Sequence, residues 1–269
     1  MFEYVIAICG FWLASPAMQL LFWCILFYYI SLVKITTTIL IIMLCPVLTH
    51  RNYITKNIFD YLSMYFLAQR IKSMTIYNYE NYQNLDGQPC ILAATPHGIM
   101  PLTPYLLFSK NDNVVIHAAS IIFYNPITRF FLCFLRGCMA HADKKSIEAT
   151  LNNKRHVLLY PGGVQEALIS NQTNCIYTKH KGFIKIAKNK NVPVIPIFIR
   201  NENKLLTDCI PSLTKWCYKT FKIPIPTLWF GLPNHIHVYF GKPLYPENYE
   251  SIEQMHENFY KQIEKLNHS

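Results

Sequence analysis

The chain has 269 residues, a formal net charge of +10 and 52% apolar residues, while only 15% of its residues are charged. This charged fraction lies well below the roughly 25% that soluble domains usually carry. The aromatic content of 14% excludes a disordered chain, and no repeat of roughly 20–50 residues points to a solenoid. The length fits one large domain, alone or with an appendage.

The charge is distributed unevenly along the chain. Residues 1–50 hold one of the 15 acids, Glu3, and one of the 25 bases, Lys34, so the whole +10 lies in the rest of the chain. The 30 residues of 4–33 carry no formal charge, and a second apolar run covers 35–48. A transmembrane helix needs about 20 apolar residues. We therefore predict a membrane anchor over residues 1–50, either one long span or a hairpin of two; a buried pair of helices is the alternative.

The flanks of the apolar block indicate topology. The start of the chain lacks the basic stretch of a secretory signal, and the apolar run is too long for one. Four bases follow the block closely, at Arg51, Lys56, Arg70 and Lys72. By the positive-inside rule we expect the remaining chain on the cytoplasmic side. The nine cysteines form no CxxC pair, which fits a reduced compartment better than a disulfide framework or a zinc site.

The pattern after the anchor predicts an α/β fold. Residues 51–84 read as an amphipathic segment that lies along the membrane or forms a surface helix. Short β-rich runs then alternate with helical ones. Strands are expected at Cys90–Thr95, Val114–Ser120, His156–Tyr160, Val192–Arg200 and His235–Gly241, and helices near 101–110, 125–137, 144–154, 180–190 and 247–266. This alternation predicts a single domain over residues 85–269, with a mostly parallel central sheet flanked by helices.

Two of these elements carry a more specific prediction. Pro193 and Pro196 fall inside the fourth strand, and proline is tolerated mainly at sheet edges or strand starts. We therefore expect that strand to be irregular. In the last helix the apolar residues share one helical stripe, which predicts a core-facing side. The stripe consists of Ile252, Met255, Phe259, Ile263 and Leu266.

Two loops at predicted strand ends carry the candidate chemistry. His97 lies in Pro96-His97-Gly98 after the first strand, and Glu166 follows the Gly162-Gly163 turn after the third. In parallel sheets functional residues gather beyond the carboxyl ends of strands. An imidazole can take a proton from an alcohol, and a carboxylate can orient it. Backbone amides of Gly98, Gly162 and Gly163 are candidate oxyanion donors.

Other kinds of site find less support. The serine-hydrolase motif GxSxG and the P-loop motif are absent from the sequence, and His235 and His237 stand without a nearby cluster that would suggest a metal site. The densest basic run includes Lys179, His180 and Lys181. It could meet acidic lipid head groups or the phosphates of coenzyme A, or it is a solvated helix face.

Five sequence blocks follow one another in a fixed order. They are Pro96-His97-Gly98-Ile99-Met100, Pro161-Gly162-Gly163-Val164-Gln165-Glu166-Ala167-Leu168, Lys181-Gly182-Phe183-Ile184-Lys185, Val192-Pro193-Val194-Ile195-Pro196 and Phe240-Gly241-Lys242-Pro243-Leu244. In this order they resemble the glycerolipid acyltransferase superfamily, and within it the mono- and diacylglycerol acyltransferase branch, most of all the transmembrane protein 68 type. The resemblance covers the chain from about residue 85 to its end.

The resemblance implies a membrane-bound acyltransferase of the endoplasmic reticulum. Acyl-CoA would be its co-substrate, or a phospholipid its acyl donor, with membrane lipids as partners, no cofactor or metal, and no nucleic acid. His97 matches the family's catalytic histidine, Glu166 the glutamate of the second block, and Gly98, Gly162 and Gly163 the glycines of the two blocks. Lys179, His180 and Lys181 are assigned to acyl-CoA or head-group binding.

The sequence departs from the family's pattern at two positions, one that bears on the orientation of His97 and one that bears on the acceptor. Phospholipid-type members have HxxxxD, but Leu102 occupies the aspartate position, so Glu166 or a more remote acid would have to orient His97. Gln165 stands where phosphate-handling members have an arginine, which favours a neutral glyceride or alcohol as acceptor. The expected activity is acyl transfer to the hydroxyl of mono- or diacylglycerol. The alternatives are a lysophospholipid or glycerol-phosphate acyltransferase and an inactive lipid-binding homologue.

Overall fold

The computed structural model describes most of the chain from residue 71 to residue 268. Within that range it leaves out 86, 100, 109–110, 112, 121–122, 124–138, 170–175, 178, 222–228 and 231–233. Before residue 71 it describes only 21, 23–25, 34 and 36–37.

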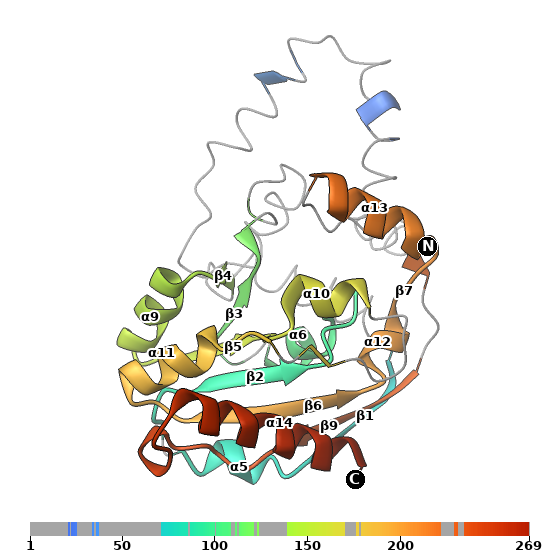
Figure 1. Cartoon of the computed structure of the whole chain (residues 1–269). Helices are drawn as coiled ribbons and strands as arrows, with labels where there is room; N and C mark the ends of the chain where they lie inside the picture. The colour runs from blue at the N-terminus through green and yellow to red at the C-terminus, as the bar shows by residue number, and fades with distance from the viewer. Residues whose placement is uncertain are drawn as a thin grey trace.

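A seven-stranded sheet forms the centre of the protein (Figure 1), with the strand order β1-β9-β6-β2-β5-β3-β4. The strands are β1 (Ile71–Tyr77), β2 (Ile91–Thr95), β3 (Val114–Ala118), β4 (Met139–His141), β5 (His156–Leu159), β6 (Val194–Arg200) and β9 (Asn234–Phe240). The five strands from β6 to β4 run parallel, whereas β9 is antiparallel to β6 and β1 is parallel to β9. The predicted mostly parallel α/β sheet is therefore confirmed.

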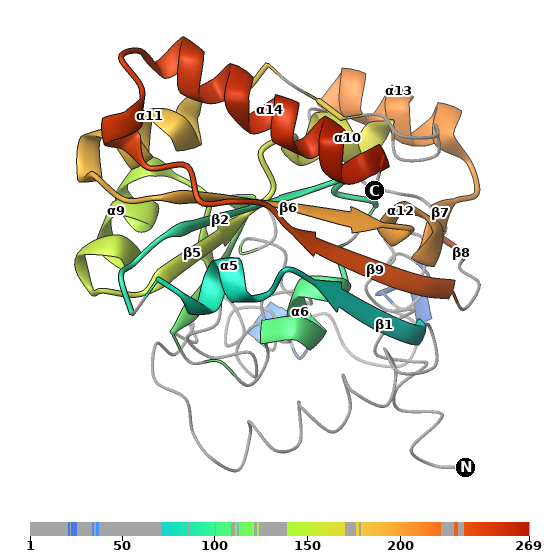
Figure 2. The same cartoon turned by 90° about the horizontal axis from the view of Figure 1, so that it is seen from below.

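Helices cover both faces of the sheet (Figure 2). They are α5 (Glu80–Gln83), α6 (Thr103–Phe108), α9 (Lys144–Asn152), α10 (Gly163–Leu168), α11 (Gly182–Lys190), α12 (Glu202–Leu205), α13 (Pro211–Phe221) and α14 (Ile252–His268), with a 3-10 turn at Pro246–Asn248. A small second sheet pairs β7 (Thr207–Asp208) with β8 (Trp229–Phe230).

The central strand β2 shows why the sheet is so apolar. Ile91 and Ala93 point into the core under α9, α11 and α14, whereas Leu92 and Ala94 point into the core shared with α6 and α12. All four side chains are fully buried. A parallel strand with both faces covered has no solvent side, so its sequence is a continuous apolar run.

The expectation of an irregular fourth strand is wrong. Pro196 lies in the regular strand β6, between β9 and β2. Its carbonyl accepts from the amide of Gly241 at 2.7 Å, so its missing N–H falls on the β9 side of the strand, where β9 has already ended at Phe240. The ladder to β2 therefore loses no hydrogen bond, and a central proline is tolerated here.

The C-terminal helix follows the predicted stripe. Met255, Phe259 and Ile263 on α14 are fully buried, and they pack with residues of β6 and α11 in the core on that side of the sheet. Ile252 and Leu266 are partly buried against the same core. The apolar spacing of three to four residues thus identifies the buried face correctly.

The predicted boundary at residue 85 is not a boundary of the fold. Residues 71–77 were expected in an amphipathic interfacial segment, yet they form the edge strand β1, which pairs with β9. The pattern of β1 is mostly exposed because an edge strand with one covered face keeps polar side chains on the other. Residues 51–70 of that segment lie outside the described residues.

Most of the predicted anchor also lies outside the described residues, as does the expected helix at 125–137. Across the part of the chain that the structure describes, we find no helix that is both long and apolar enough to cross a membrane.

Candidate active site

The candidate site lies at the carboxyl ends of three adjacent strands. β2 lies between β5 and β6, and the segment after each strand contributes one ionisable residue. His97 follows β2, Glu166 lies on α10 after β5, and Glu202 begins α12 after β6. The first two were predicted from the sequence, and the structure brings them together.

Glu166 is a buried carboxylate with three donors around it. Its exposed fraction is 1%. Oε1 accepts from the Thr95 hydroxyl at 2.7 Å and from the Tyr177 amide at 3.4 Å, and Oε2 accepts from the His97 backbone amide at 3.0 Å. Burial raises the pKa of Glu166 to about 7, although these hydrogen bonds act in the opposite direction.

The imidazole of His97 is oriented by a different group. Its Nδ1 lies 2.8 Å from the carbonyl oxygen of Gly98. A carbonyl can only accept, so Nδ1 carries the proton and Nε2 keeps its lone pair. Gly98 adopts a φ of +64°, a conformation that few other residues accept. The expectation that Glu166 or a more remote acid orients the ring is therefore wrong for Nδ1, which faces a carbonyl, and Glu166 holds the histidine's main chain.

His97 is poised as a neutral base. Burial lowers its pKa, and the hydrogen bond to Gly98 opposes this shift only in part. The ring also meets the ring of Tyr160 edge-on, with centroids 4.9 Å apart. A neutral imidazole with a free Nε2 near pH 7 can accept a proton from an alcohol.

Three glycines were predicted as oxyanion donors, and their amides differ in whether they already donate a hydrogen bond within the described residues. The amide of Gly163 donates to the Tyr160 carbonyl at 3.1 Å, so it is engaged in the turn. The amides of Gly98 and Gly162 donate to no other described residue. Gly162 has a further role, because a Cβ there would lie 2.5 Å from Oε2 of Glu166. Only glycine lets the carboxylate fold back over this turn.

Glu202 was not among the residues predicted from the sequence. This carboxylate is also 1% exposed, and it accepts from the Leu102 amide at 2.5 Å, from the Thr103 amide at 3.2 Å and from the Thr103 hydroxyl. Burial raises its pKa to about 7. The signal was its place directly after the end of β6, the same kind of position that singled out His97 and Glu166.

Together the two glutamates hold both ends of the histidine loop. Glu166 fixes the amide of His97, and Glu202 fixes the amides of Leu102 and Thr103 at the start of α6. The Gly98 Cα faces the backbone of Glu202, since a Cβ there would lie 3.4 Å from the Glu202 carbonyl. Leu102, at the position of the missing aspartate, is buried in the core instead.

A cavity of about 430 Å³ adjoins this site. Tyr160, whose ring contacts that of His97, and Gly163 line it, and Lys144, His180 and Lys185 supply its basic groups. Its lining includes no acidic residue among those described. Of the predicted basic run, His180 reaches this cavity, and its Nδ1 lies 2.8 Å from the Pro161 carbonyl.

The other two members of that run lie elsewhere. Lys179 is exposed, and Lys181 pairs with Glu253 of α14 at 3.3 Å. In the part of the chain described, no group of three His, Cys, Asp or Glu side chains could hold a metal ion.

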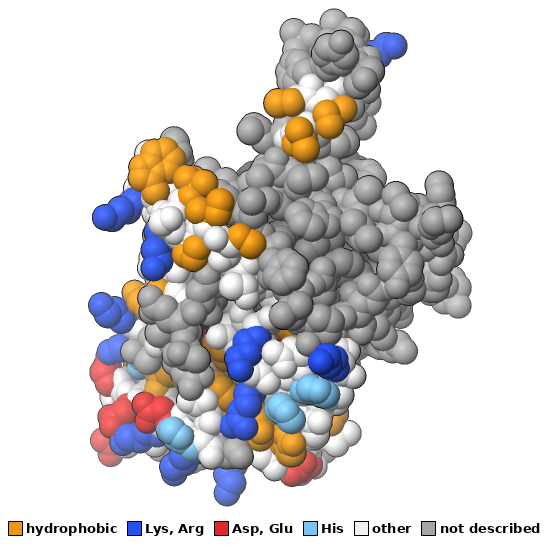
Figure 3. Space-filling model, turned by 90° about the vertical axis from the view of Figure 1, so that its right-hand side faces the viewer, with side chains coloured by type: hydrophobic (Ala, Val, Ile, Leu, Met, Phe, Trp, Pro, Cys, Tyr) orange, Lys and Arg blue, Asp and Glu red, His pale blue; other side chains and the backbone are white. Residues whose placement is uncertain are grey.

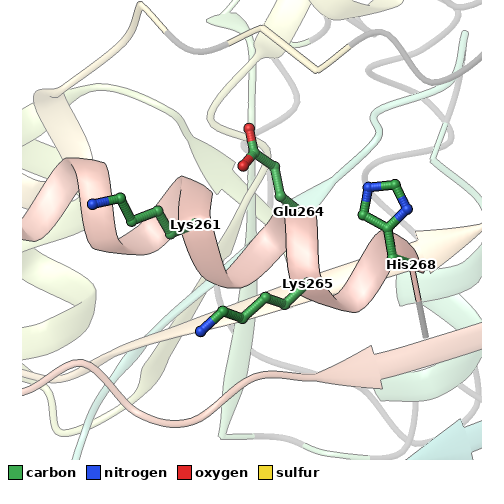
Figure 4. A pocket seen from close by; sticks show the side chains of 4 residues that line it. All are labelled: Lys261, Glu264, Lys265 and His268. Atoms are coloured by element: carbon green, nitrogen blue, oxygen red, sulfur yellow. The ribbon is translucent and has the colours of Figure 1, made fainter.

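A second hollow lies along α14 (Figure 4). Its lining, Lys261, Glu264, Lys265 and His268, comes from that one helix. It contains none of the residues of the candidate site.

Comparison with known proteins fits this geometry. The model of the family described as diacylglycerol acyltransferase matches residues 20–267. The chain belongs to the diacylglycerol acyltransferase family. This confirms the resemblance drawn from the histidine and Gly-Gly blocks, and it places the chain in a family of acyltransferases.

Two relatives and one solved structure illustrate the similarity. A human protein named "DGAT1/2-independent enzyme synthesizing storage lipids" is 28% identical over 156 residues, which cover 55% of this chain and 47% of that protein. Diacylglycerol O-acyltransferase 1 of Saccharomyces cerevisiae is 27% identical over 206 residues, covering 66% of this chain and 49% of that protein. The chain thus spans about half the length of the curated relatives it matches.

The solved structure is the 1-acyl-sn-glycerophosphate acyltransferase PlsC of Thermotoga maritima. Its TM-score is 0.55 at 12% identity, over 99% of this chain and 95% of that one. At this identity the likeness concerns the fold, and it supports the family's α/β architecture for this chain.

Proposed function

We propose that the protein is a membrane-bound enzyme that transfers a fatty acyl group from acyl-CoA to the hydroxyl of a neutral glycerolipid, mono- or diacylglycerol. The observation that carries the proposal is the orientation of His97, whose Nδ1 is held by the Gly98 carbonyl so that Nε2 is left as a base. The printed names of the family and of its yeast relative support diacylglycerol as the acceptor.

The reaction needs one proton transfer in each direction. Nε2 of His97 removes the hydroxyl proton as the acceptor oxygen attacks the thioester carbonyl carbon. The amides of Gly98 and Gly162 are the donors we assign to the resulting oxyanion. The carbon–sulfur bond then breaks, and the departing thiolate takes the proton from His97. A thioester is already activated, so no covalent acyl-enzyme is required.

The cavity beside Tyr160 is our candidate site for the acyl donor. Lys144, Lys185 and His180 line it, and its described lining includes no acidic residue, which suits the phosphates of coenzyme A. Outside the lining, Lys144 pairs with Glu148 at 3.8 Å. Exposed Lys179 would add to the positive potential outside it, whereas the charge of Lys181 is offset by its ion pair with Glu253.

The acceptor is argued from Gln165. Its side-chain amide donates to the Tyr218 hydroxyl at 2.9 Å, so the position offers no cation to a phosphorylated acceptor. A neutral glyceride fits this better than a lysophospholipid or glycerol phosphate. Such an acceptor resides in a membrane, and we assign the enzyme to the endoplasmic reticulum membrane with its catalytic domain on the cytoplasmic side.

An acceptor panel with radiolabelled acyl-CoA tests the proposal. The purified full chain should acylate mono- or diacylglycerol, and His97→Ala should abolish the transfer while the thermal melt stays unchanged. Exposed His235, changed to Ala, is the matched control and should keep full activity. Incorporation into phospholipid alone would instead favour a lysophospholipid acyltransferase, and lipid binding without any turnover would favour an inactive homologue.

A further inference from the structure

Helix α13 presents apolar side chains to solvent. Trp216 is 55% exposed and Leu213 39%, and Ile210, directly before the helix, is 38% exposed. Large apolar side chains on a soluble helix normally face the core. Figure 3 shows hydrophobic side chains gathered over this helix, with basic side chains next to them.

The opposite face of α13 is already used. Thr214 is buried, and the Tyr218 hydroxyl accepts from Gln165 of α10 at 2.9 Å. The helix is therefore attached to the domain by the side that carries Thr214 and Tyr218. The exposed apolar residues lie on its other side.

The exposed face has an apolar part and a basic part. Leu213 and Trp216 are three residues apart and lie on one side, and Lys215 and Lys219, four residues apart, lie next to each other on the adjoining side. Both lysines are exposed, and the helix contains no acidic residue. Such a division, with an aromatic ring among the apolar residues, is typical of helices that lie in a membrane interface.

We propose that α13 docks on the surface of a bilayer that contains anionic lipids. Trp216, Leu213 and Ile210 enter the boundary between head groups and acyl chains, and Lys215 and Lys219 contact the lipid phosphates. A second observation points to the same end of the molecule. The described pieces of the N-terminal segment, which expose Leu21 and Ile25 at 51% each, lie toward the same upper end of Figure 1 as α13.

This docking would hold the candidate site close to the lipid. Gln165, which anchors α13, directly precedes Glu166 on α10. The Gln165–Tyr218 hydrogen bond and the peptide unit between Gln165 and Glu166 therefore connect the docked helix α13 to the buried carboxylate of Glu166. The inference concerns where the domain lies and does not depend on which acyl acceptor it uses.

The test measures the depth of Trp216 in the membrane. The full chain, with Trp12, Trp23 and Trp229 changed to Phe, is reconstituted into vesicles of phosphatidylcholine and phosphatidylserine with or without brominated acyl chains. We expect brominated lipid to quench at least half of the Trp216 emission, together with a blue shift. The matched control changes Trp216 to Phe as well and places a reporter on α5 by Gln83→Trp, at the opposite end of the molecule (Figure 1). This reporter should remain unquenched.

Two further measurements keep the inference falsifiable. The difference spectrum between the wild-type and Trp216→Phe proteins gives the same information if the multiple variant does not fold. Lys215→Gln with Lys219→Gln should reduce the quenching in anionic vesicles and leave it unchanged in vesicles of phosphatidylcholine alone. Quenching of Trp216 no stronger than that of the α5 reporter would overturn the inference, whether or not the preparation is active.

Discussion

Oε2 of Glu166 lies 3.0 Å from the backbone amide of His97, so the glutamate holds the histidine by its main chain and not by its ring. Its other oxygen is held by Thr95, the last residue of β2. The carboxylate thus links the ends of two adjacent strands, and it fixes where the histidine loop begins.

Removing the Glu166 carboxylate should destabilise the protein and stop the reaction. Glu166→Ala leaves the Thr95 hydroxyl and the amides of His97 and Tyr177 without their acceptor, and each unsatisfied buried group costs about 1–3 kcal/mol. We expect a loss of several kcal/mol in the free energy of unfolding, at least tenfold lower transfer activity, and milder losses for Glu166→Gln. Thermal melts and the acyl-transfer assay measure both, with exposed Glu264→Ala as the neutral control. Wild-type activity in Glu166→Ala would show that the link is not needed.

Gly162→Ala should act on the site through Glu166. The new methyl group would lie 2.5 Å from Oε2, so the carboxylate must move away from His97. We expect activity to fall at least tenfold and stability to fall by about 1–3 kcal/mol, as in other overpacked positions. Glu264→Ala is again the control, since Glu264 is exposed on α14 and does not line the cavity beside Tyr160. Equal activity of the two variants would contradict this reading.

The pH dependence of the rate should identify the base. Because burial lowers the pKa of His97, kcat/KM should rise with pH along an acid limb whose midpoint lies below 6.5 and then stay level through pH 7. If ionisation of Glu166 governed the rate instead, the limb would lie near its pKa of about 7. Rate profiles of the wild type and Glu166→Gln decide between the two. A midpoint that moves in the variant would assign the limb to the glutamate.

Glu202 should make the fold less stable as the pH rises. Its pKa is raised from 4.5 to about 7, so between these values the folded chain binds more protons than the unfolded one. Its contribution is complete below pH 4.5, falls as the pH rises toward 7, and is lost above that. Comparing the melting temperatures of the wild type and Glu202→Gln from pH 4 to 8 isolates the contribution of Glu202. The melting temperature of the variant should fall less with rising pH than that of the wild type. An equal or steeper decline would argue against a raised pKa.

The basic cavity makes a prediction about the acyl donor. Changing both Lys144 and Lys185 to Gln should raise KM for acyl-CoA about tenfold or more and leave KM for the acceptor nearly unchanged, because the lysines lie in the cavity next to Tyr160. Lys145→Gln is the control on the same helix, as this residue does not line the cavity. A changed KM for the acceptor alone would place the acceptor there instead.

Much of the fold could be predicted because its signals are local. The apolar runs of β2, β3, β5 and β9 and the stripe of α14 lie on contiguous sequence, and their positions are confirmed within a few residues. β1 escaped prediction since an edge strand, mostly exposed, has no such run. The order of the strands, which places β2 between β5 and β6, depends on pairing between distant segments.

The site was predictable in its residues and not in its contacts. His97 and Glu166 stand out because each comes after a strand end, His97 next to Gly98 and Glu166 shortly after Gly162-Gly163. That Gly98 accepts from the histidine ring depends on the positive φ of Gly98, and that Glu202 reaches Thr103 depends on a contact between residues 99 positions apart. Neither geometry leaves a pattern in one sequence.

The carbonyl of Gly98 has a chemical consequence of its own. A carboxylate beside an imidazole stabilises the imidazolium by its charge, whereas an uncharged carbonyl orients the ring and leaves the cation more acidic. In the proposed reaction His97 would therefore release its captured proton readily to the departing thiolate. The neutral imidazole of His97 is thus a weaker base and its imidazolium a stronger acid, which favours protonation of the departing thiolate.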